Sequence, residues 1–438
     1  MASTYLYRTN SQSYNRKTWT FSAWIKRSYI GGNNTHLYAT DTAANNFSRI
    51  YINGSNHLCY YDADGGSTAC YLETNRVLRD LNGWYHVMIV LDTTQSTADN
   101  RIKMYINGVQ ETSFAYRTNP SQNADLRMNI NTQHNLGKNG NNQTAECWDG
   151  YMSHVHFIDG TAYDASAFGS TDSTTGEWKI NTSPSVTYGT NGWFILKDGN
   201  SGTDQSPNSN NYTASGNLTK SEDNPSNVFA TWNPLVNPWS GATTWTYGNT
   251  RAYNSDSSKG SVVTTLGATS GKYYMEVKQE NANGVWIGVC GDGFVSDNLL
   301  NKYSGSTQDA TTGLLIKYSD GTRAVNNTDT NSVFATTGSG DITGIALDLD
   351  ATTKTVTFYK NGVADSAGSQ NLPTNMQTGA VFGCAIVFSG SAVNLNAGNG
   401  YFANNAISSE GTNASGIGKF EYDVPANHTA LSTKGLNE

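Results

Sequence analysis

The carboxylates that come nearest to a catalytic pair are Glu146 and Asp149, in the string Glu-Cys-Trp-Asp. Hydrolysis of a glycosidic bond uses two carboxyl groups, one as the acid and one as the nucleophile or base. The spacing of these two residues does not suit that pairing, and no third carboxylate follows. A Gly-x-Ser-x-Gly string is absent, and Ser270-Gly271-Lys272 lacks the rest of a phosphate-binding loop. We therefore expect a protein that is not an enzyme.

Two short stretches carry side chains that could bind a metal ion. Asp62 and Asp64, followed by two glycines, offer carboxylate oxygens of the kind that Ca²⁺ binds. The same residues suit a hairpin turn made of Asp and Gly, and we favour the turn. His154 and His156 lie on one face of an expected strand and could join a metal site. A histidine pair that is solvated or satisfied in the core is the simpler interpretation, and we expect no other cofactor.

Four aromatic residues in expected loops could stack on sugar rings, namely Trp148, Tyr163, Tyr188 and Trp239. These residues are the ligand-binding candidates that the sequence offers. The alternative role is packing, because Trp and Tyr side chains in sandwiches are mostly buried.

The elements that would position these residues are β-strands. Residues 84–109 read as an apolar strand, a polar loop, an alternating strand and a closing Asn-Gly pair. Alternation over residues 102–106 indicates a half-buried strand, and Asn-Gly suits a type I′ turn. Residues 344–363 repeat the same order and again end in Asn-Gly-Val. Two copies of one hairpin predict two β domains of related build.

Composition agrees with a turn-rich β protein that has a neutral, polar surface. The 438 residues include 44 glycines, only 14% are charged, and the net charge is −8. No Lys/Arg cluster is present, so we expect no nucleic-acid partner. The longest apolar stretch, Ala380–Phe388, is too short to cross a bilayer, so we expect no membrane insertion. The best helical candidate is Thr74–Leu81, which is at most two turns long.

The five cysteines raise the question of a disulfide. Cys59 and Cys70 flank a polar turn and could face each other across a hairpin. The N-terminus shows no basic region followed by an apolar one, which would mark a secretory signal. We therefore favour reduced thiols and folding in a cytoplasm.

The succession of short strands predicts an all-β chain with two antiparallel, jelly-roll-like β-sandwich domains in tandem. Residues 198–239 are dense in Asn, Ser, Gly and Asp and hold four of the eight prolines. Such a tract marks an interdomain connection. We expect a first sandwich over residues 1–223, a linker over 224–239 and a second sandwich over 240–438.

The first half resembles the laminin-G/pentraxin-like branch of the concanavalin A-like lectin/glucanase sandwiches. The resemblance lies in Trp19–Ser28, in the strand and Asn-Gly turn of residues 84–109, and in Asp149–Gly160. Glucanases of this fold carry Glu-x-Asp-x-x-Glu, which this chain lacks, whereas laminin-G loops often bind calcium. The resemblance thus implies a β-sandwich without hydrolase activity. It also implies that Asp62 and Asp64 are candidates for calcium ligands.

The second half is similar to SPRY domains. Gly271–Val277, Gly284–Cys290 and Gly344–Val363 match, in order, three signature strands of that family. The extension that some SPRY domains carry is not recognisable. The resemblance therefore implies the SPRY core alone.

Four further strings resemble virion proteins of marine tailed bacteriophages: Phe157–Ala162, Asn191–Phe194, Asn224–Pro234 and the ending Phe420–Leu431. This resemblance implies a fibre or adhesin on the virion surface, made in the host cytoplasm. We expect it to bind a host-surface glycan or protein through sandwich loops and to form a homo-oligomer with other virion proteins around it. One alternative is a structural or decoration protein that contacts mainly other virion chains, and a weaker one is a glycan hydrolase.

Overall fold

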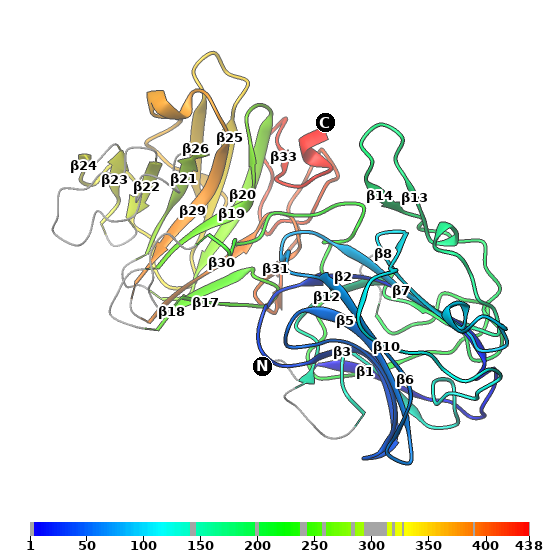
Figure 1. The fold of residues 1–438 in the computed structure, drawn as a ribbon. Helices are drawn as coiled ribbons and strands as arrows, with labels where there is room; N and C mark the ends of the chain where they lie inside the picture. Colours follow the sequence, from blue (N-terminus) through cyan, green and yellow to red (C-terminus); the bar gives the residue numbers. More distant parts are fainter. Residues whose placement is uncertain are drawn as a thin grey trace. The chain divides into compact units, whose positions relative to one another are not determined.

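The chain folds into β-strands joined by loops and short 3-10 turns, so the expected all-β class is confirmed. The structure, a computed structural model, describes residues 4–140, 146–197, 201–236, 243–255, 260–281, 285–292, 313–317, 320–325, 328–388 and 390–437. Contacts divide the chain into two compact units (Figure 1). The first unit is Met1–Lys220 with Asn224–Ser226, and the second is Ser221–Asp223 with Asn227–Glu438.

The first unit contains two large antiparallel sheets. Its strands are β1 (Tyr5–Thr9), β2 (Thr18–Arg27), β3 (Thr35–Ala43), β4 (Asn46–Ile52), β5 (His57–Asp64), β6 (Ser67–Val77), β7 (Tyr85–Asp92), β8 (Ile102–Ile106), β9 (Val109–Gln110), β10 (Phe114–Thr118), β11 (Gln133–Leu136), β12 (Gly150–Asp159), β13 (Gly169–Thr171), β14 (Trp178–Ile180), β15 (Trp193–Ile195) and β16 (Thr213–Ser215). The larger sheet has the order β10-β6-β5-β4-β3-β11-β1-β16, and the smaller one β15-β12-β2-β7-β8-β9. Strands β13 and β14 form a separate hairpin.

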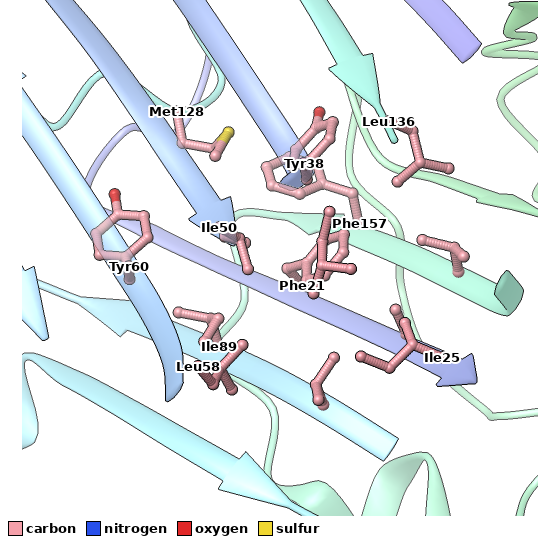
Figure 2. Packing of buried hydrophobic residues seen from close by; sticks show 14 of the residues in the cluster. Phe21, Ile25, Tyr38, Ile50, Leu58, Tyr60, Ile89, Met128, Leu136 and Phe157 are labelled. Atoms are coloured by element: carbon pink, nitrogen blue, oxygen red, sulfur yellow. The ribbon is translucent and has the colours of Figure 1, made fainter. Parts of the chain in front are cut away.

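The core of the first unit is built from alternate residues of both sheets. Trp19, Phe21 and Ile25 of β2 are fully buried there, together with Tyr38 and Ile50 of the larger sheet. The rings of Phe21 and Tyr38 stack with their centroids 5.4 Å apart, and Figure 2 shows this packing. Complete burial of side chains of this size stabilises the fold by roughly 1.5–3 kcal/mol each.

A second apolar cluster lies on the other face of the smaller sheet. Met88 and Ile158 project from that face and pack against Phe168 and Tyr188, which belong to the chain after β12. The segment that follows β12 therefore covers the outer side of the smaller sheet, and its aromatic residues serve as packing.

The two hairpins predicted from Asn-Gly pairs are confirmed. In the first, Asn107 and Gly108 join β8 to β9 with φ values of 49° and 74°. In the second, Asn361 and Gly362 join β26 (Thr355–Lys360) to β27 (Val363–Ala364) with φ values of 48° and 79°. Positive φ at both positions is what a type I′ turn requires.

The second unit also contains two large sheets. Its other strands are β17 (Thr243–Thr246), β18 (Arg251–Asn254), β19 (Gly260–Ala268), β20 (Lys272–Gln279), β21 (Trp286–Gly291), β22 (Gly313–Lys317), β23 (Thr322–Val325), β24 (Thr328–Thr330), β25 (Ile342–Asp348), β28 (Gln370–Asn371), β29 (Val381–Val387), β30 (Ser391–Asn396), β31 (Tyr401–Phe402), β32 (Asn405–Ala406) and β33 (Thr429–Ala430). One sheet has the order β17-β18-β30-β20-β25-β26-β27, with β28 beside β26 and β33 beside β20. The other has the order β19-β29-β21-β22-β23-β24. The pairing of β20 with β33 is parallel.

The C-terminal part of the chain packs on the nine-stranded sheet. Tyr274 of β20 is fully buried against Phe420, with ring centroids 5.2 Å apart. On the same strand, Glu276 is buried and accepts hydrogen bonds from the backbone N–H groups of Glu421 and Tyr422, at 2.9 Å each. A polar anchor and an apolar contact thus hold this segment in place.

Described residues of the Asn-, Ser- and Pro-rich tract 198–239 pack into the two units. Tyr212 lies in the first core, and β16 pairs with β1. Phe229 and Trp232 are buried in the second unit, and the N–H of Ala230 donates to the carbonyl oxygen of Leu431 at 3.0 Å. The domain limits at residues 223 and 240 stay a prediction. Residues 227–233, which belong to the expected linker, pack into the second unit.

The predicted helix over Thr74–Leu81 is wrong. Strand β6 continues to Val77, because its residues pair with β5 and β10 on either side. Leu78 and Leu81 are buried without a helix, so their helical spacing reflects two separate core contacts. Across the described ranges, no helix is both long and apolar enough to cross a membrane.

The five cysteines are free and buried. Cys59 lies opposite Glu73 and Cys70 lies opposite Asp62 in the pairing of β5 with β6. Cys70 belongs to the core, and Cys59 points to the other face of the sheet. The two thiols therefore lie on opposite faces and do not meet in a disulfide, in agreement with the expected reduced state.

Candidate functional site: an aromatic row on the large sheet of the first unit

The aromatic residues singled out in the sequence lie in packed surroundings. Trp148 is 8% exposed and belongs to the core of the first unit. Tyr188 is 9% exposed, and its hydroxyl lies 3.0 Å from Nδ1 of His156. Tyr163 is half-buried in the same outer cluster as Tyr188, and Trp239 lies outside the described residues. Their role in ligand binding stays a prediction.

The proposed calcium ligands lie at the tip of the β5–β6 hairpin. Asp62 is buried and accepts hydrogen bonds from the backbone N–H of Arg127 at 2.8 Å and the hydroxyl of Tyr60 at 3.3 Å. Burial raises its pKa to about 6. Asp64 is exposed and pairs with the guanidinium of Arg127. Within the described part of the chain, no three His, Cys, Asp or Glu side chains group as metal ligands would. Calcium binding here stays a prediction.

The histidines of β12 hydrogen-bond to hydroxyl groups. A register shift between Ser153 and His156 marks a bulge, and His154 in it has a φ of 46°. Nδ1 of His154 lies 2.8 Å from the Ser153 hydroxyl, and Nδ1 of His156 lies 3.0 Å from the Tyr188 hydroxyl. Both imidazole rings are buried, which agrees with the simpler expectation that the core satisfies this histidine pair.

Ser22 and His86 form a serine–histidine pair that sequence spacing does not reveal. The Ser22 hydroxyl lies 2.8 Å from Nε2 of His86, and the indole N–H of Trp178 donates to Nδ1 at 3.1 Å. Nδ1 is therefore an acceptor, and the proton of the neutral ring lies on Nε2. A catalytic histidine needs the opposite tautomer, with Nε2 free to take the serine proton. This buried pair is a structural contact.

A row of four aromatic rings lies on the larger sheet, one from each of four neighbouring strands. Phe47 of β4, Tyr61 of β5, Tyr71 of β6 and Tyr116 of β10 form this aromatic row. Their ring centroids follow one another at 4.9, 5.1 and 4.8 Å. These steps match the spacing between neighbouring strands of a sheet, so the row runs across the strands.

Strand alternation places the row on the face that points away from the core. Tyr60 is fully buried in the core, so its neighbour Tyr61 must project to the opposite face. Tyr61 lies directly opposite Tyr71, which brings the two rings together. Tyr116 is 53% exposed at the edge strand, whereas Tyr61 and Tyr71 are half-buried. The row therefore opens to solvent toward the β10 edge of the sheet.

Polar groups border the row on its long sides. The Tyr71 hydroxyl donates to Glu73 at 2.6 Å, and Nδ2 of Asn53 donates to the other oxygen of Glu73 at 3.0 Å. The Arg49 guanidinium lies 3.8 Å from the centre of the Phe47 ring and pairs with Asp41 at 2.9 Å. The row thus combines apolar ring surfaces with hydrogen-bonding groups. Asp41 and Arg49 neutralise each other, whereas the carboxylate of Glu73 is held by two neutral donors.

Such a surface can hold a ligand that has both apolar and hydroxyl faces. Aromatic rings offer a large contact area at low cost in side-chain entropy, and tyrosine adds a hydroxyl to it. The sequence does not reveal the row, because it arises from the cross-strand register of four strands. Its only sequence signal is the outward position in each alternating strand.

Comparison with known proteins adds to this description. No curated protein sequence matched the chain. The SPRY domain of human HERC1 is 17% identical over 37% of this chain and 96% of its own length, with a TM-score of 0.29. The SAP-like pentraxin from Limulus polyphemus is 19% identical over 36% of this chain and 71% of its own, with a TM-score of 0.27. Residues 2–166 match the family model of the concanavalin A-like lectin/glucanases superfamily, and the whole aromatic row lies within this matched stretch.

Proposed function

We propose that the chain is a non-enzymatic binding protein that holds a glycan on the aromatic row. The observation that supports this proposal is the row of rings, spaced 4.8–5.1 Å apart, on an outward sheet face. Its three tyrosines are partly or largely exposed, whereas Phe47 is buried beneath the Arg49 guanidinium and closes the row at one end. Sugar rings present C–H groups on one face and hydroxyls around the rim. The C–H groups would pack on the tyrosine rings, and the hydroxyls would meet Glu73, Asn53 and the tyrosine hydroxyls.

The balance of charge around the row favours a neutral glycan. Asp41 and Arg49 neutralise each other, and the carboxylate of Glu73 already accepts two hydrogen bonds. A ligand with many negative charges would gain little here, and the chain as a whole has a net charge of −8. Contacts between neutral groups also persist in salt water, where the attraction between exposed charges is screened.

The same proposal covers the biological setting. We infer a fibre or adhesin on the surface of a virion, made in the host cytoplasm, which contacts a glycan or protein of the host surface. Several copies in a homo-oligomer, next to other virion proteins, would convert weak single contacts into strong attachment. This setting depends on the resemblance to virion proteins of tailed bacteriophages.

Binding of the full chain to an array of neutral glycans tests the proposal. Replacing Tyr116 or Tyr71 with Ala should weaken binding about tenfold, because each ring would contribute about 1–2 kcal/mol of buried contact. Tyr29→Ala is the matched control, since Tyr29 is also 53% exposed in the first unit but lies outside the row. Absence of binding to any array glycan by an oligomeric preparation would reject the proposal. Equal binding by all three variants would reject the row as the site.

A further inference from the structure

The second unit contains a hollow of about 750 Å³ whose walls are both polar and apolar. One wall is the start of β20, with Lys272 and Tyr273, and another is the loop after β25, with Asp350. The C-terminal segment closes the remaining side with Asn427, His428 and Asn437. The volume lies within the range of pockets that hold small ligands.

The walls of the hollow are tied to one another by backbone contacts. The N–H of Gly271 donates to Oδ1 of Asp350 at 2.7 Å, and the N–H of Leu349 donates to the carbonyl oxygen of Gly271 at 2.9 Å. Tyr273 lies opposite Thr429 in the parallel pairing of β20 with β33. The hollow is therefore part of the folded sheet, and the backbone of its walls is held in place before a ligand arrives.

The charges along the hollow leave one carboxylate available. The ammonium group of Lys272 pairs with Asp348 at 2.7 Å and is thereby neutralised. Asp350 is exposed, and only its Oδ1 takes part in the contact with Gly271. Its second oxygen can accept a strong, charge-assisted hydrogen bond from a ligand hydroxyl.

His428 adds a neutral acceptor. Its Nδ1 lies 3.0 Å from the carbonyl oxygen of Ala426, which only accepts, so Nδ1 carries the proton and Nε2 accepts. Burial lowers the pKa of His428 below its ordinary value, so the ring is neutral at pH 7. Amide groups of Asn427 and Asn437 at the rim both donate and accept.

We propose that this hollow binds the ring of a neutral saccharide, whose neighbouring hydroxyls donate to Asp350 and His428 and accept from the asparagine amides. An anionic ligand would be repelled by the carboxylate of Asp350, and the ammonium group of Lys272 is already paired with Asp348. An apolar ligand would leave the polar walls without partners, which is costly. The site is separate from the aromatic row and does not depend on the function proposed for it.

Saturation-transfer NMR on the full chain tests this proposal, with glucose, galactose, mannose and N-acetylglucosamine as separate probes. At least one sugar should receive saturation. Asp350→Asn should weaken its affinity about tenfold, because a charge-assisted hydrogen bond becomes a neutral one. This variant keeps an acceptor for the N–H of Gly271, so the loop remains folded. Asn427→Gly is a second variant, which removes the amide at an exposed rim position and accommodates its φ of 64°, and it should also weaken binding.

Two controls separate this site from others. Glu410→Ala removes an exposed carboxylate of the second unit outside the hollow and should leave sugar binding unchanged. Tyr71→Ala should also leave it unchanged, because that ring belongs to the aromatic row. Lack of saturation with all four sugars would overturn the proposal. Asp350→Asn and Asn427→Gly variants that both bind the sugar as tightly as the native chain would overturn it as well. Binding that only Tyr71→Ala abolishes would overturn it too, while leaving the function proposed for the row in place.

Discussion

The side-chain oxygen of Asn107 accepts a hydrogen bond from the backbone N–H of His86 at 2.8 Å, and the Asn107 N–H donates back to the carbonyl oxygen of His86 at 2.8 Å. The second unit repeats this contact, because Asn361 makes the same two bonds with Ile342 at 2.8 and 2.9 Å. Each Asn thus supplies both the positive φ of its turn and an extra bond to the neighbouring strand of the sheet, β7 in the first unit and β25 in the second.

The first prediction concerns these two asparagines. Asn107→Ala and Asn361→Ala should each destabilise their unit by about 2 kcal/mol, through strain at positive φ and loss of the side-chain bond. Asn→Gly at the same positions removes the bond but relieves the strain, and should cost about half as much. Urea unfolding of the full chain, followed by fluorescence, measures both effects. Equal costs for Ala and Gly would show that strain is unimportant.

The second prediction concerns the pH dependence of the second unit. Burial raises the pKa of Glu276 to about 7 from an ordinary value of 4.5. The folded state therefore binds the proton more tightly than the unfolded state, and the contribution of Glu276 to stability falls as the pH rises from 4.5 to 7. Relative to Glu276→Gln, which does not titrate, the native chain should lose on the order of 2–3 kcal/mol over this range. Parallel stability profiles for the two proteins would contradict the assignment.

The third prediction concerns Asp159, which joins distant segments of the first unit. Its Oδ1 accepts from Nδ2 of Asn15 at 2.9 Å and Nδ2 of Asn129 at 2.8 Å, and its Oδ2 accepts from the N–H of Asn191 at 3.0 Å. Asp159→Asn places an amide N–H₂ against these donors and should cost about 2–4 kcal/mol. Asp164→Asn, at an exposed position that accepts from the N–H of Ser166, should cost less than about 1 kcal/mol. Thermal unfolding of both variants gives the comparison.

The fourth prediction concerns the thiols. Burial raises the pKa of Cys59 to about 12, and the other four thiols are also buried. A thiol reagent should therefore react slowly with the native chain and label all five cysteines after unfolding without reductant. Fewer than five labelled thiols in the unfolded chain would indicate a disulfide and contradict the separation of Cys59 and Cys70.

Strand identity could be predicted where a short stretch carries its own signal. The alternation of residues 102–106 and the Asn-Gly pairs that end both hairpins led to the correct strands and turns. The prediction failed at Leu78 and Leu81, whose helical spacing comes from two contacts with the core. Local pattern alone cannot distinguish these cases, because cross-strand pairing of β6 outweighs the propensity of one segment.

The candidate sites were less accessible to prediction. Tyr61 and Tyr71 are ten residues apart, and only the register of β5 and β6 places their rings 5.1 Å apart. Asp350 and His428 line one hollow only because β33 joins β20 in parallel. Single residues such as Trp148 were chosen by type, whereas these surfaces depend on which strands become neighbours.

Because Ala230 hydrogen-bonds to Leu431 and β33 lies beside β20, the second unit joins its first residues to its last. On the ribosome, a chain that has emerged only as far as residue 400 still lacks the partner of Ala230 and an edge of β20. The first unit, whose contacts all lie before residue 227, can fold during synthesis. The second must wait until residues 429–431 have emerged, and until then its unpaired strands are exposed to aggregation.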